Sequence, residues 1–146
     1  MSVEASRVHT TINATPAAVW EAFMTPATFK QFFFGSDVGT DWKVGSPITF
    51  RGEFKGKKYE DKGVVKTVDE GKRLAFTHWS AMSGMEDVPE NYHIVAFDLK
   101  PAGNGTEVTL SQTNQNDNEP LTDKNRAEYD RNWTMVLDGL KKAVES

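Results

Sequence analysis

Two histidines and one glutamine are the side chains of this sequence best suited to chemistry. His78, His93 and Gln112 lie in three separate segments in which apolar and polar residues alternate, and each shares the parity of its apolar neighbours. A histidine placed inward can act as a general acid or base, or can fix the polar end of a ligand. A buried imidazole or amide is more often a hydrogen-bonded core residue, so that interpretation stays open for all three.

Several other kinds of site are disfavoured by the sequence. Cysteine is absent, which excludes disulfides, thiolate nucleophiles and cysteine metal ligands. His9 has the opposite parity to the other two histidines, so the three ligands of a zinc site are not assembled and we expect no metal. Neither a nucleophile elbow nor a phosphate-binding loop is present, and we expect no cofactor. The acids of the middle hairpins are interpreted as solvated, with no acid–base dyad: Glu60, Asp61, Asp69 and Glu70.

The element that must cover these side chains is predicted at the end of the chain, from Thr122 to Glu145. Its apolar residues fall at helical spacing on one stripe: Tyr129, Trp133, Val136, Leu137, Leu140 and Val144. Acids lead this segment and lysines end it, which suits the helix dipole. A stripe of this kind must be buried, and a sheet is the expected cover.

The remaining elements follow in a simple order. A strand is predicted over Arg7–Asn13, and Thr15-Pro16 and Thr25-Pro26 each begin a short helix, the second ending near Gly35. From Gly39 the apolar period changes to two and turns recur, which predicts an antiparallel meander. The fold class is therefore α+β, with about six or seven strands curved around the long final helix.

Composition limits the function further. The chain has 146 residues, a net charge of −4 and a pI near 5.4, which fits one domain over residues 1–146. Without clustered positive charge, nucleic acid and anionic membranes are disfavoured as partners. Apolar runs are too short for a membrane span and the N-terminus is too polar for a signal peptide, so we expect a cytoplasmic protein.

Short motifs along nearly the whole chain resemble those of a known family. They include Thr15–Phe23 (TPAAVWEAF), Val44-Gly45 with Ile48 and Phe50, Gly105–Leu110 (GTEVTL) and Asn132-Trp133. In this order they are similar to the family of the activator of the ninety-kilodalton heat-shock chaperone ATPase (AHSA-like), within the helix-grip superfamily of START, polyketide-cyclase and birch-pollen-allergen-like (SRPBCC) domains. The chaperone activator carries an additional N-terminal chaperone-binding domain that we do not find in this sequence, so chaperone binding is not supported.

The resemblance implies a pocket between the sheet and the last helix. We expect a small apolar or aromatic, lipid-like ligand there, with the histidines and Gln112 at its polar end. The expected ligand-binding residues are Phe32, Phe33, Trp42, Phe50, Phe54, Phe76, His78, His93, Val95, Phe97, Leu110, Gln112, Trp133, Val136, Leu137 and Leu140. Two alternatives remain: an enzyme of the cyclase or hydratase kind with an inward histidine as acid–base, and an interaction module that binds a partner through its surface.

Overall fold

The computed structural model describes residues 2–146 and consists of one antiparallel sheet with helices on one side. The strands are β1 (Val3–Ile12), β2 (Asp37–Gly39), β3 (Pro47–Phe54), β4 (Lys57–Asp69), β5 (Arg73–His78), β6 (His93–Ala102) and β7 (Gly105–Asn114). The α-helices are α1 (Pro16–Met24), α2 (Pro26–Phe32) and α3 (Asp123–Glu145), and short 3₁₀ turns cover Ala81–Ser83 and Pro89–Asn91. Every neighbouring pair in the sheet is antiparallel, in the order β1-β7-β6-β5-β4-β3-β2.

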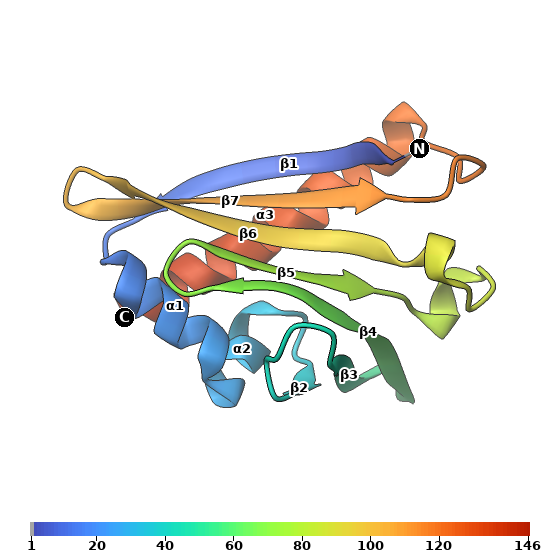
Figure 1. Ribbon diagram of the computed structural model, residues 1–146, viewed down its shortest axis with the longest axis horizontal. Helices are drawn as coiled ribbons and strands as arrows, with labels where there is room; N and C mark the ends of the chain where they lie inside the picture. Colours follow the sequence, from blue (N-terminus) through green and yellow to red (C-terminus); the bar gives the residue numbers. More distant parts are fainter. Residues whose placement is uncertain (1) are drawn as a thin grey trace.

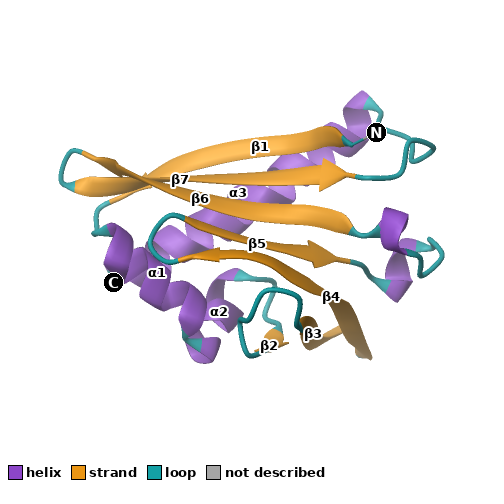
Figure 2. Ribbon diagram, in the orientation of Figure 1, coloured by secondary structure: helices purple, strands orange, loops and turns teal. Residues whose placement is uncertain are grey.

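The long C-terminal helix lies diagonally across one face of the sheet (Figure 1). The Thr122 hydroxyl caps α3 by accepting from the Asn125 N–H, and the buried side of α3 carries Trp133, Val136, Leu137 and Leu140. Colouring by secondary structure shows α1 and α2 near the C-terminal end of α3, below the same sheet (Figure 2). This is the predicted α+β helix-grip architecture.

The free edge of β1 is protected by α3. The Lys141 ammonium donates to the Thr11 carbonyl at 2.6 Å, and the Ser6 hydroxyl donates to the Asp130 carboxylate at 2.5 Å. An unpaired edge would offer its backbone groups to another chain. The contact from Lys141 satisfies one of these groups, and the contact to Ser6 holds α3 beside the edge.

The space between the sheet and α3 is filled by aromatic rings. Phe33 lies at the centre of this cluster, with its ring centroid 5.2 Å from Phe50, 5.9 Å from Phe76 and 6.0 Å from Trp133. Phe23 continues the packing to Phe97 at 4.9 Å. Aromatic pairs at such separations add specific edge and offset contacts to the area that they bury. Side chains therefore fill most of the space between the sheet and α3.

The inward parity of β4, which the sequence leaves open, is decided by register. Asp61 lies opposite Phe50 and Gly63 opposite Ile48, so the odd-numbered residues face the interior up to Val65. A register shift between Val65 and Thr67 marks a bulge. The carboxylate of Asp61 consequently faces the interior, and its interpretation as a solvated hairpin residue is wrong.

No helix in the part of the chain that the structure describes is long and apolar enough to cross a membrane.

Candidate functional site

An open pocket of about 290 Å³ lies where the β3–β4 hairpin meets the segment after α2; we call it the mouth pocket. Its lining combines aromatic and sulfur-containing side chains with a few polar groups: Phe33, Phe34, Ser36, Glu53, Phe54, Tyr59, Asp61, His78 and Met82. The left-handed backbone at Phe34 (φ 55°) and Gly35 (φ 69°) turns the chain sharply after α2. This turn leaves the Phe34 ring 5.9 Å from Trp133 and 47% of the residue exposed.

Asp61 and His78 form a hydrogen-bonded pair on the wall of the mouth pocket. The Asp61 Oδ2 lies 3.0 Å from the His78 Nε2, and their side chains are 15% and 24% exposed. The imidazole packs against the Phe50 ring at 5.2 Å. A carboxylate that accepts from Nε2 fixes the orientation of the ring. The other ring nitrogen, Nδ1, has no hydrogen-bond partner among residues 2–146.

Two hydroxyls form a second polar pair in the same pocket. The Ser36 Oγ lies 2.8 Å from the Tyr59 OH, and either oxygen can be the donor. Ser36 is buried and follows α2, whereas Tyr59 lies on β4 two positions before Asp61 on the same face. An apolar pocket with a small number of placed polar groups is the usual form of a small-molecule site.

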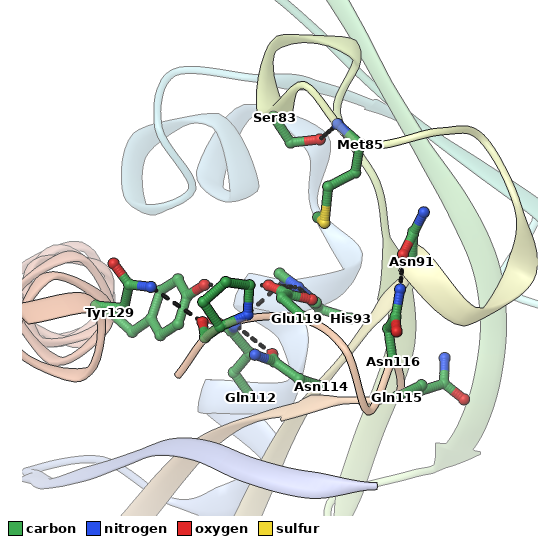
Figure 3. A network of polar contacts seen from close by, with 12 residues as sticks. Ser83, Met85, Asn91, His93, Gln112, Asn114, Gln115, Asn116, Glu119 and Tyr129 are labelled. Atoms are coloured by element: carbon green, nitrogen blue, oxygen red, sulfur yellow. Dashed lines mark hydrogen bonds and ion pairs between the residues drawn. The ribbon is translucent and has the colours of Figure 1, made fainter. Parts of the chain in front are cut away.

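His93 lies directly opposite His78 in the sheet but belongs to a different network. Its Nε2 is 2.9 Å from both carboxylate oxygens of Glu119, whose side chain is only 8% exposed. Its Nδ1 lies 3.2 Å from the Gln112 Nε2. These side chains converge from β6, β7 and the segment before α3 (Figure 3). The imidazole therefore ties the β7–α3 connection to the sheet.

Trp133 sets the polarity of this second network. Its indole N–H only donates, and it donates to the Gln112 Oε1 at 2.8 Å. The amide of Gln112 must then present its NH₂ group to the His93 Nδ1 and to the Asn114 Oδ1, the latter at 2.8 Å. The arrangement fits His93 as the tautomer that carries its proton on Nε2, donated to Glu119. The buried Asn114 Nδ2 is left without a partner among the described residues.

Tyr129 on α3 belongs to the same network, and its hydroxyl makes the unfolding free energy decrease at alkaline pH. Burial, and then the negative charge of Glu119, raise the pKa of the Tyr129 hydroxyl above its ordinary value of 10.0. The folded state therefore keeps this proton at a pH where the unfolded chain loses it. The protonated hydroxyl of Tyr129 therefore contributes fully to the unfolding free energy below pH 10. This contribution is lost as the pH rises through the higher pKa of the folded state.

We expect the unfolding free energy of the wild type to fall between pH 9 and pH 11 more steeply than that of Tyr129→Phe, because the variant has no phenol to ionise at this position. Urea titrations at stepped pH measure both slopes. The comparison also removes the contribution of Tyr92, whose pKa is likewise raised by burial and which both proteins share. Parallel curves for the two proteins would contradict the assigned environment of Tyr129.

The structure divides the sequence-predicted ligand residues into four groups. Phe33, Phe54 and His78 line the mouth pocket, and Trp133 lies just behind it against Phe34. His93 and Gln112 form the second network. Trp42 is half-buried with a left-handed backbone (φ 60°) and contacts Phe29 at 6.2 Å. The others are packed in the core: Phe32, Phe50, Phe76, Val95, Phe97, Leu110, Val136, Leu137 and Leu140.

Several lining residues escaped the sequence analysis. Ser36 and Tyr59 carry no recognisable motif, and Phe34 follows a helix whose apolar stripe it does not share. Asp61 alone had a usable signal, since it shares the parity of Val65 on the same strand, but only the strand register shows that it lies on the same face as Phe50. Among the described residues, no three histidine or acidic side chains are grouped closely enough to hold a metal ion.

Comparison with known proteins agrees with this architecture. The family model described as "Activator of Hsp90 ATPase homolog 1-like protein" matches residues 13–145. A protein of known solution structure from Cytophaga hutchinsonii is 41% identical, with a TM-score of 0.78 over 99% of this chain and 94% of that one. Among curated proteins, none matches the sequence significantly.

Two more distant structures share the fold. The Aha1 dimer from Colwellia psychrerythraea is 22% identical with a TM-score of 0.69, over 99% of this chain and 96% of that one. Ara h 8.0201 is 14% identical with a TM-score of 0.74, over 99% and 97%. From the family match over residues 13–145, the sheet wrapped on α3 and these likenesses, we conclude that the chain belongs to the Activator of Hsp90 ATPase homolog 1-like family.

Proposed function

We propose that the protein binds a small, largely apolar and ring-containing ligand in the mouth pocket. The observation that carries this proposal is the presence of two hydrogen-bonded polar pairs, Asp61–His78 and Ser36–Tyr59, in a pocket otherwise lined largely by aromatic side chains and a methionine. At about 290 Å³ the pocket is at the lower end of the range for ligand sites. A single or fused ring with one polar substituent suits this size and lining.

The polar substituent is expected to meet His78. Because Asp61 accepts from Nε2, the neutral ring presents Nδ1 as an acceptor, and a hydroxyl group on the ligand can donate to it. The apolar body would lie against Phe34, Phe54 and Met82, which are 47%, 53% and 60% exposed. Covering these large apolar side chains would provide most of the binding free energy.

A matched pair of probes tests this assignment. We expect 2-naphthol to perturb the amide resonances of the mouth pocket and to bind more tightly than 2-methylnaphthalene, which replaces the hydroxyl by a methyl group. His78→Phe should lower the affinity for 2-naphthol by about tenfold, which corresponds to the loss of one hydrogen bond. The affinity for 2-methylnaphthalene should stay nearly unchanged. NMR titrations measure both affinities.

His9→Phe is the control for this experiment, since His9 is an exposed histidine on β1 and the substitution is the same. The control should bind both probes as the wild type does. If 2-naphthol perturbs residues outside the mouth pocket only, or binds the His78→Phe variant as tightly as the wild type, the assignment is wrong.

The Asp61–His78 pair also favours a second candidate, an enzyme that transfers protons. An imidazole oriented by a carboxylate is a suitable general base, and a hydroxyl such as that of Tyr59 can stabilise a developing enolate oxygen. In that case the protein would take a proton from the carbon next to a carbonyl group. Exchange of these protons of phenylacetone in D₂O, faster with the wild type than with His78→Phe, would support an enzyme. Equal exchange rates for the two proteins would contradict an enzyme and leave ligand binding as the proposed function.

A further inference from the structure

A second hollow of about 350 Å³ lies on the opposite face of the sheet, away from α3; we call it the outer pocket. Its floor is formed by residues of β4 and β5 that point away from the core, among them Val64, Lys66 and Thr77. Its rim is formed by Asp87, Pro89 and Tyr92 from the connection between β5 and β6. This connection extends beyond the end of the sheet, beside the segment between β7 and α3 (Figure 1).

The outer pocket carries one positive charge that no residue in the described part of the chain neutralises. Lys62 and Asp87 compensate each other, with the Lys62 Nζ 2.6 Å from the Asp87 Oδ2 and 5.6 Å from the Trp79 ring. The hydrogen bond to Asp87 raises the pKa of Lys62 above its ordinary value, which favours the charged ammonium in this pair. Lys66 has no ion-pair partner among residues 2–146 and also lines the pocket. The local balance favours a ligand with a single negative charge.

A buried hydroxyl lines the same pocket as this charge. Thr77 is 4% exposed, and its Oγ1 accepts from the Val64 N–H at 2.9 Å. The proton of the same hydroxyl has no acceptor among the described residues. A buried donor of this kind needs an acceptor. An anionic oxygen in the outer pocket would supply it.

The rest of the lining is suited to a flat apolar group. Val64 is 37% exposed on the floor, and Pro89 and Tyr92 close the side. The Tyr92 ring is held in place by stacking on Trp79, with ring centroids 6.0 Å apart and planes at 21°. Its hydroxyl donates to Asp87, which further fixes the rim.

We propose that the outer pocket binds a small carboxylic acid with an aromatic or similarly flat apolar body. The carboxylate pairs with Lys66 and accepts from the Thr77 hydroxyl, and the body lies on Val64, Pro89 and Tyr92. Because Asp87 is paired with Lys62, only the charge of Lys66 is left to balance a ligand, which disfavours ligands of higher negative charge such as phosphate. The site lies on the other side of the sheet from the mouth pocket and does not depend on a ligand there.

Benzoate, benzyl alcohol and inorganic phosphate test the proposal by NMR titration of the full chain. We expect benzoate to shift the amide resonances of Lys66, Thr77 and Tyr92, and to bind at least threefold more tightly than neutral benzyl alcohol or phosphate. Lys66→Gln should lower the affinity for benzoate by about threefold, which corresponds to the loss of an exposed ion pair. The affinity for benzyl alcohol should not change. Benzoate binding should also weaken in 0.5 M salt.

Lys72→Gln is the matched control, because Lys72 is an exposed lysine in the β4–β5 turn, outside the outer pocket. It should bind benzoate as the wild type does. Unchanged benzoate affinity in Lys66→Gln, equal affinity for benzyl alcohol, equal affinity for phosphate, or shifts confined to the mouth pocket would each overturn the proposal. The first three outcomes do not bear on whether 2-naphthol binds beside His78.

Discussion

Replacing Trp133 by alanine is expected to lower the free energy of unfolding by about 3–5 kcal/mol, the range for truncating a buried aromatic residue. The indole is 7% exposed and contacts the rings of Phe33 and Phe34, so its removal opens a cavity behind the mouth pocket. It also removes the donor to Gln112. Since domains of this size are stable by about 5–15 kcal/mol, the loss is a large part of the total.

Trp133→Phe separates the two contributions. This variant keeps a ring but leaves the buried Gln112 Oε1 without its donor, which costs about 1–3 kcal/mol. Urea unfolding followed by circular dichroism measures both variants. Met135→Ala is the control on the same helix, because Met135 is 60% exposed, and it should change stability by less than about 0.5 kcal/mol. A Trp133→Ala protein as stable as this control would contradict the packing of α3 described above.

Gly63→Ala is the second substitution with a large expected effect. A Cβ at this position would lie 1.6 Å from the Thr77 carbonyl oxygen and 2.4 Å from its carbon. Both are backbone atoms and cannot rotate away, so β4 and β5 would have to separate. Overpacking usually costs about 1–3 kcal/mol, and a clash with the neighbouring strand is expected to exceed about 4 kcal/mol. The variant should unfold at a much lower urea concentration or fail to fold.

The same substitution tests how the mouth pocket is positioned. Gly63 lies between the pairs Lys62–Trp79 and Val65–Phe76, close to Asp61 on β4 and to His78 at the end of β5. If the variant folds, separation of the strands should weaken 2-naphthol binding as well. Val64→Ala is the neighbouring control, since Val64 is 37% exposed, and should cost less than about 1 kcal/mol. A Gly63→Ala protein with wild-type stability would show that the strands are not in the close contact described.

The elements were predictable where the signal is local. The final helix was predicted from Thr122 to Glu145 and occupies Asp123–Glu145. The prediction succeeded because the cap and the apolar stripe both depend on residues that are close together in the sequence. The helix starts at Pro16 and Pro26 follow from the Thr-Pro pairs in the same way. The three-residue strand β2 was missed, since Asp37–Gly39 is too short for any alternation to appear.

The candidate site was predicted only in part, for a different reason. His78 was selected correctly as an inward residue from its own strand, and Phe33 and Phe54 were among the expected lining residues. Asp61, the hydrogen-bond partner of His78, lies on another strand. The Gly63-Val64-Val65 stretch of that strand allows either parity. A shift of one residue would turn Asp61 to solvent, so the sequence alone favoured the wrong interpretation.

The sequence by itself determined the three helices and the longer strands, and the buried face of most of them, because periods of 3.6 and 2 residues are properties of the backbone. The tertiary structure decided how much of the interior remains open and which polar groups meet. Phe33, Phe76 and Trp133 come from distant segments, and the packing of Phe33 against the other two rings fills the interior beside the mouth pocket. Hydrogen bonds such as Asp61–His78 and Trp133–Gln112 join residues on separate elements, so no local pattern specifies them.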